Sequence, residues 1–140
     1  VKNFYYFCES CTNLTSVPAL NTSNATNMQD MFYNCSSLET LPEFNGGKCS
    51  NFNYFCTGSN LVNFGGIVDM GKTSSITLTR FLTSPKLSYE SCMNVINKLY
   101  DRASAGYSVV TLSFHATPYA LLSADDIAIA TAKGWTVQAG

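Results

Sequence analysis

Residues 24–42 read NATNMQDMFYNCSSLETLP, and this stretch decides the fold because it repeats. Moving it 24 positions toward the N-terminus places Asn27 on Asn3, and moving it 24 positions the other way places Asn27 on Asn51. Self-similarity at a period of roughly 20 to 50 residues is the signature of stacked repeats. The chain is therefore expected to be an array of similar units, each packed on the next.

Three units are predicted, over residues 1–24, 25–48 and 49–69. Each begins with an Asn and two apolar residues three positions apart, a spacing that suits one helical turn or a tight bend with its apolar side inward. A small polar corner follows, and then an L-x-x-L-like segment, which we interpret as a short strand. Two of these strands end before Pro18 and Pro42, because proline cannot donate to a continuing ladder. The predicted strands are Leu14–Val17, Leu38–Leu41 and Leu61–Phe64.

A degenerate fourth unit is expected after an irregular stretch at residues 65–75. Phe81–Leu87 matches Phe32–Leu38 in length and in its end residues, and Ile76–Leu78 is predicted to be a strand. A weakened repeat is typical of the approach to the end of an array.

The period changes after Leu87, where the sequence predicts helix, strand, helix and strand. Ser88 and Ser123 are good helix N-caps, and the second helix has a capping-box arrangement with Asp126. Such a segment is expected to cover the open end of the repeats, with Trp135 buried against the second helix. The predicted elements are a helix from Ser88 to Gly106, a strand at Val109–Phe114, a helix from Ser123 to Gly134 and a strand at Trp135–Gln138.

With these residues in view, residues 24–42 resemble the repeat of BspA-type leucine-rich-repeat proteins, N-x-T-x-M-x-x-M-F-x-x-C-x-S-L. SPKLSYESCMNVINKLY (84–100), followed by LSADDIAIATAKGWTV (122–137), is similar to the C-terminal cap of such proteins from gut bacteria and their phages. The resemblance implies a curved, right-handed leucine-rich-repeat solenoid of α/β content. It implies repeats over residues 1–87 and an α/β capping region of the same domain over residues 88–140.

The resemblance also implies a place on a cell surface, or on a phage particle, and binding to a host protein or to another cell. Our first hypothesis is a non-catalytic recognition or adhesion module for a protein or glycan. The second is a structural segment of a larger surface or phage-tail protein, with no ligand of its own. The outward strand positions Ser16, Thr40 and Asn63 are the candidate binding residues. They are small and polar, which favours the second hypothesis or a weak, wet interface.

Composition limits the other functions. The chain has 140 residues and a net charge of −1, without a run of Lys or Arg, so nucleic-acid binding is not expected. No apolar run approaches the ~20 residues of a membrane helix, so insertion by this segment is not expected. The chain begins inside a repeat without a signal segment, and we interpret it as a fragment of an extracellular or surface protein.

Six cysteines leave two alternatives open, buried thiols or a disulfide framework. Cys8 and Cys56 share a repeat column with Phe32, which favours cysteine acting as a small buried hydrophobe. Cys8 and Cys11 form a single C-x-x-C pair, and the only histidine, His115, lies more than 100 residues away. A structural zinc needs four ligands. Neither a metal nor another cofactor is therefore expected.

No catalytic residues are predicted either. His115 ends a strand and has no Asp or Glu nearby in the sequence, although a triad needs a carboxylate and a nucleophile beside it. Asp125 and Asp126 fall in the first turn of a predicted helix, where carboxylates are favourable for structural reasons. The protein is therefore not expected to be an enzyme.

Overall fold

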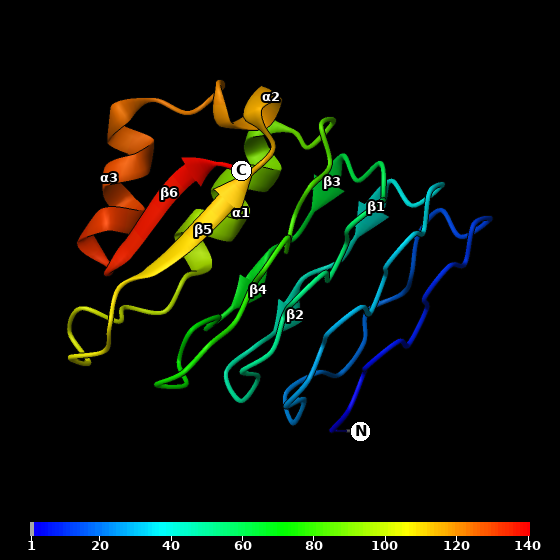
Figure 1. The fold of residues 1–140 in the computed structure, drawn as a ribbon, viewed down its shortest axis with the longest axis horizontal. Coiled ribbons are helices and arrows are strands. Elements are labelled where there is room, and N and C mark those ends of the chain that lie inside the picture. The colour runs from blue at the N-terminus through cyan, green and yellow to red at the C-terminus, as the bar shows by residue number, and fades with distance from the viewer. Residues whose placement is uncertain (1) are drawn as a thin grey trace.

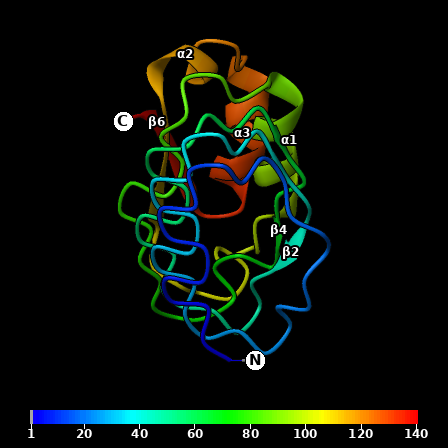
Figure 2. The same cartoon turned by 90° about the vertical axis from the view of Figure 1, so that its right-hand side faces the viewer.

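Four turn segments, at residues 3–10, 27–34, 51–58 and 77–83, lie side by side in the computed structural model, which describes residues 2–140 (Figure 1). Parallel bridges join Asn3 to Asn27, Asn27 to Asn51 and Asn51 to Thr77. The first three segments keep the spacing of the sequence repeat. In Figure 2 the successive segments overlie one another around a common interior, and the helices lie at one end of the molecule.

The fourth segment is shifted by one residue from the register that the sequence predicted. Phe32 donates its N–H to the carbonyl of Phe55 (2.9 Å), and Cys56 in the same column donates to Phe81 (3.2 Å). Phe81 therefore follows Phe55 in its column and not Phe32. The fourth segment is 26 residues from the third, as the bridge between Asn51 and Thr77 shows, which explains the shift.

The expected leucine-rich-repeat solenoid is wrong. The strands form three separate two-stranded parallel sheets instead of one continuous face, and the fold is mixed α/β. The predicted strands Leu14–Val17 and Ile76–Leu78 contribute only isolated bridges, at Ser16 and Thr77. The pairs are β1 (Thr40–Leu41) with β3 (Asn63–Phe64), β2 (Phe44–Asn45) with β4 (Ile67–Val68), and β5 (Val110–Phe114) with β6 (Trp135–Ala139).

Backbone conformation explains why the strands are so short. Residues at positive φ interrupt each turn segment, for example Asp30 (φ 54°) and Asn34 (φ 56°) in the second. A left-handed residue cannot continue an extended strand. On the other side of the second unit, Pro42 separates β1 from β2, and in the third unit Gly66 (φ 84°) lies between β3 and β4.

The C-terminal part holds helices α1 (Tyr89–Lys98), α2 (Ala116–Tyr119) and α3 (Ala124–Ala132). The predicted caps at Ser88 and Ser123 are confirmed, including the capping box. The first helix ends at Lys98 and not near Gly106, because Tyr100 leaves it to donate its N–H to the carbonyl of Met70 (3.0 Å). The short helix α2 was not predicted.

One apolar core runs from the turn segments into the C-terminal part. Phe32, Phe44, Phe55, Phe64 and Phe81 meet in edge-on and tilted pairs, with centroids 5.4 to 6.4 Å apart. These geometries are favourable for aromatic rings.

In the first unit, only one residue of the apolar pair that was predicted to face inward is buried. Phe4 is buried, but Phe7 is 50% exposed.

Trp135 is only 1% exposed, which confirms its expected burial. Its indole N–H donates to the carbonyl of Tyr100 (3.0 Å). Its ring also lies against Gly71, where an added Cβ would overlap Cζ2 of the indole. The C-terminal part is thus packed directly on the irregular stretch 65–75.

Candidate functional site

The stacked asparagines start each turn segment in the same way. The Oδ1 atom of Asn27 accepts the backbone N–H of Gln29 at 2.9 Å, and Asn3 and Asn51 accept the N–H two residues ahead at 2.9 and 3.0 Å. These are Asx-turns, in which the side chain fixes the next bend of the backbone. The first three segments therefore begin with the same bend, whereas the fourth begins with Thr77.

A column of left-handed residues runs across the four segments. Tyr6, Asp30, Tyr54 and Arg80 have φ values of 59°, 54°, 55° and 50°, and a second column contains Ser10 and Asn34. Gly or Asn is the usual residue at such a position, and a bulky side chain there is strained. Strain of this kind is concentrated at functional sites. The two tyrosines in the column are therefore candidate functional residues.

Three tyrosines and three polar residues enclose a shallow groove of about 430 Å³, which we name the tyrosine face: Tyr6, Tyr33, Tyr54, Glu9, Gln29 and Asp30. The Tyr33 and Tyr54 rings lie edge-to-face with centroids 6.4 Å apart. Tyr6 is 44% exposed, and its ring is tilted against the ring of Tyr5 with centroids 3.8 Å apart. The groove thus offers aromatic ring surface to a ligand.

The polar groups of the tyrosine face are held in place. Gln29 donates through Nε2 to Oδ2 of Asp30 (2.9 Å) and accepts through Oε1 from Nδ2 of Asn51 (2.8 Å). The pKa of Tyr6 is raised to about 12 by its hydrogen bond with Tyr5, by partial desolvation and by the nearby carboxylates of Asp30 and Glu9. The lining contains two acids and no base. Electrostatics therefore favour an uncharged or cationic ligand.

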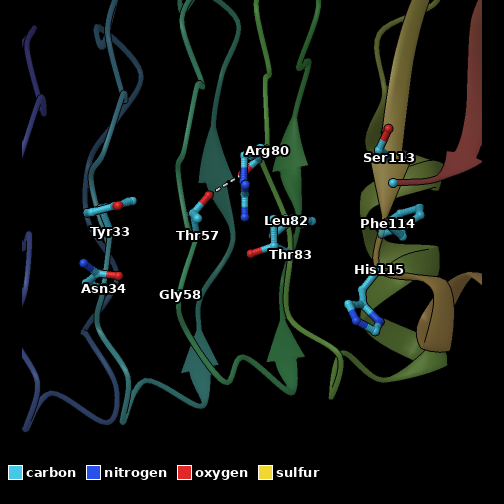
Figure 3. Close-up of a pocket in the computed structure, with 11 residues that line it drawn as sticks. Tyr33, Asn34, Thr57, Gly58, Arg80, Leu82, Thr83, Ser113, Phe114 and His115 are labelled. Carbon is cyan, nitrogen blue, oxygen red and sulfur yellow. Dashed lines mark hydrogen bonds between the residues drawn. The ribbon is translucent and has the colours of Figure 1, made fainter.

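A larger groove of about 750 Å³ separates the turn segments from β5 (Figure 3). Tyr33, Thr57 and Arg80 lie on one wall, and Phe114 and His115 on the other. The hydroxyl of Thr57 donates to the carbonyl of Arg80 (2.5 Å) and fixes the first wall. Tyr33 lines both grooves.

His115 has a structural partner. Its Nδ1 accepts the backbone N–H of Thr117 (3.1 Å), which makes it the N-cap of α2. In the neutral ring the proton then lies on Nε2. The side chains that line the 750 Å³ groove include no Asp or Glu that could orient this ring.

Asp126 caps its helix as the sequence predicted. Its Oδ2 accepts the N–H of Ser123 (2.9 Å), and its Oδ1 accepts the hydroxyl of Tyr89 (3.1 Å). These hydrogen bonds, that from the Ser123 N–H above all, hold the pKa of Asp126 below its ordinary value of 3.8. The carboxylate thus has structural partners for both of its oxygens.

No metal centre is formed by residues 2–140, where no three His, Cys, Asp or Glu side chains gather closely enough to hold an ion. All six cysteines are free thiols. Cys35 donates to the carbonyl of Cys8 (2.8 Å), so the C-x-x-C pair belongs to the packing of neighbouring segments.

The predicted binding residues Ser16, Thr40 and Asn63 form one exposed row. Ser16 bridges Thr40, and Thr40 pairs with Asn63 between β1 and β3. The row carries no aromatic side chain, and its binding role stays a prediction. The sequence reasoning missed the tyrosine face, although the 24-residue spacing that joins Tyr6, Asp30 and Tyr54 was visible.

No protein-family model, curated protein or solved structure matches this chain. Between residues 2 and 140, none of the helices has the length and apolar character required to cross a bilayer.

Proposed function

We propose that this protein is a non-catalytic recognition module, displayed on a cell surface, that binds a protein or a glycan through the tyrosine face. The observation that carries the proposal is the row formed by Tyr6, Tyr33 and Tyr54 beside the carboxylates of Glu9 and Asp30. Tyrosine gives a large, rigid and amphipathic contact area at low entropic cost, and is therefore frequent in recognition surfaces.

The backbone of the turn segments supports the same proposal. Tyr6 and Tyr54 keep bulky side chains at φ values near those of Asp30, although Asn or Gly would relieve the strain. The energetic cost is explained if the rings contact a ligand. Gln29 in the lining then provides an amide group for hydrogen bonding beside the rings.

A second candidate function is a structural segment without a ligand. The exposed row of Ser16, Thr40 and Asn63 favours it, because small polar side chains provide little binding energy. This function predicts that the isolated protein binds no surface glycan or protein at all.

Binding of the labelled protein to a glycan array and to cultured epithelial cells tests the proposal. We expect binding that falls at least tenfold in Tyr33→Ala and in Tyr54→Asn, since asparagine is accepted at positive φ and leaves the fold intact. The matched controls Thr40→Ala and Asn63→Ala remove side chains from the row and should bind like the parent protein. Equal binding by all four variants contradicts a role for the tyrosine face, and no binding by the parent protein favours the structural segment.

A further inference from the structure

The last turn segment has an edge of unpaired hydrogen-bond donors. In the third segment, the N–H groups at alternate positions from Phe52 to Cys56 donate to carbonyls of the fourth. Leu78, Arg80 and Leu82 occupy the same positions in the fourth segment, and their N–H groups meet no acceptor within residues 2–140. The third segment shows that alternate N–H groups of this turn conformation can bond carbonyls two residues apart in a neighbouring stretch of chain.

The facing strand also has a free edge. Phe114 accepts the N–H of Gly140 (2.9 Å), so it directs its backbone groups toward β6. Backbone groups alternate along a strand, and Thr111 and Ser113 therefore direct theirs away from β6. Neither residue makes another backbone hydrogen bond within the described chain. An open strand edge of this kind is a template for pairing with another chain.

A continuous groove separates these two edges. One part, of about 420 Å³, lies between the stretch 76–80 and the start of β5. The other part is the 750 Å³ groove at the end of β5 (Figure 3). The two parts share Arg80 and Ser113. Together they follow all of β5, which is roughly 17 Å long at its five residues.

The positive charge in the groove favours peptides that carry acidic side chains. Arg80 is the only Lys, Arg, Asp or Glu side chain in the lining of either part. It stands in the middle of the donor edge, between Leu78 and Leu82. A carboxylate at this place gains a charge-assisted hydrogen bond in addition to the backbone donors.

We propose that this groove binds an extended acidic peptide. The peptide adds a strand to the outer edge of β5 through Thr111 and Ser113. It gives its carbonyls to the N–H groups of Leu78 and Leu82 and places an Asp or Glu side chain on the guanidinium of Arg80. Backbone pairing provides affinity and the carboxylate provides selectivity, as in other cases of strand addition.

A phage library of random nonapeptides tests the proposal. Binders are selected on the parent protein after depletion on the double variant Thr111→Pro/Arg80→Asn. Both substitutions suit their backbones, because proline is accepted on an edge strand and asparagine at positive φ. We expect enriched peptides with Asp or Glu at one fixed position. In synthetic form, they should lose at least tenfold in affinity when alternate residues are N-methylated, and at least tenfold on Arg80→Asn.

Two controls separate strand pairing from non-specific binding. Arg80→Lys keeps a cation and should retain more affinity than Arg80→Asn, and Thr111→Val keeps the edge N–H and should bind like the parent protein. Peptide binding should also shift the amide NMR resonances of Leu78, Arg80 and Leu82. The proposal is overturned if no peptide is enriched, if N-methylation leaves the affinity unchanged, or if Tyr54→Asn abolishes binding while the double variant does not.

Discussion

Arg102 and Trp135 are stacked in the interior, with the guanidinium carbon 6.0 Å from the centroid of the indole ring. Arg102 is 1% exposed and lies over Tyr107 as well, at 5.3 Å. Its guanidinium donates to the carbonyls of Gly71 (2.6 Å), Thr73 (2.8 Å) and Ser74 (2.8 Å), and Nε donates to Ser108. The ion pairs among residues 2–140 do not involve it. This buried cation is therefore stabilised by carbonyls and aromatic rings instead of a carboxylate.

Arg102→Met should lower the free energy of unfolding by at least about 1 to 3 kcal/mol, the cost of leaving a buried carbonyl without its donor. Arg102→Lys should recover only part of this loss, since an ammonium group cannot reproduce the planar fork of donors. Urea unfolding followed by the fluorescence of Trp135 measures both. Lys86→Gln, which removes an exposed cation, is the control, and equal stability of all three variants would show that Arg102 is not a structural link.

Two substitutions in the second column of left-handed residues should have opposite effects on stability. Ser10 has φ 56°, and Ser10→Gly should raise the free energy of unfolding by up to about 1 kcal/mol. Gly58→Ala should lower it by more than that amount, because φ is 83° and the new Cβ would lie 2.5 Å from Oδ1 of Asn34. Thermal unfolding of the two variants checks the signs. Effects of the same sign in both would mean that the column is not under strain.

Acid should weaken the attachment of α3. The folded-state pKa of Asp126 is below the ordinary 3.8, so its contribution to stability is complete above that value and is lost as the pH falls through the lower one. The melting temperature should therefore begin to fall below about pH 5 and continue to fall as the pH drops past 3.8. Asp126→Asn should show a shallower fall over this range, and Asp125→Asn serves as the neighbouring control. An identical pH profile for Asp126→Asn and the parent protein contradicts the prediction.

The cysteines should react in a fixed order. Burial raises the pKa of Cys8 and Cys49 to about 11 and that of Cys92 to about 12, so these thiols carry almost no thiolate at pH 8. Cys11 is exposed and should be alkylated first by iodoacetamide. After unfolding without reductant, mass spectrometry should find six modified thiols. Masses that indicate three intact disulfides would support the alternative framework.

Local signals in the sequence were sufficient for several parts of the fold. The asparagine column follows from the 24-residue spacing, and the caps at Ser88 and Ser123 follow from residue types that bond the first turn of a helix. The strands β5 and β6 were found within one residue of their ends, because their apolar residues alternate. These features depend on neighbours in the chain.

The remaining features depend on contacts far apart in the chain. The end of α1 is set by Met70, and the burial of Arg102 is set by carbonyls about 30 residues earlier. The left-handed backbone at Tyr54 could not be predicted from the sequence, because tyrosine is not typical of that conformation. The repeat motif was correct as a period but wrong as a sign of a leucine-rich-repeat solenoid. The groove beside β5 could not be located for the same reason, whereas the tyrosine face was missed although its 24-residue spacing was visible in the sequence.

The hydrogen bonds between turn segments give that side of the molecule a local electrical direction. Tyr6 donates to the carbonyl of Gln29, Asp30 to that of Asn53 and Tyr54 to that of Thr79, so these peptide groups point the same way across the stack. Aligned peptide dipoles add, as they do along a helix. The positive pole falls at the fourth segment, at the end where Arg80 stands. On the other side of the units some bonds run the opposite way, from Val62 to the carbonyl of Glu39 and from Gly65 to that of Leu41, so the alignment is local to the turn segments and its field acts on charged groups at their edge.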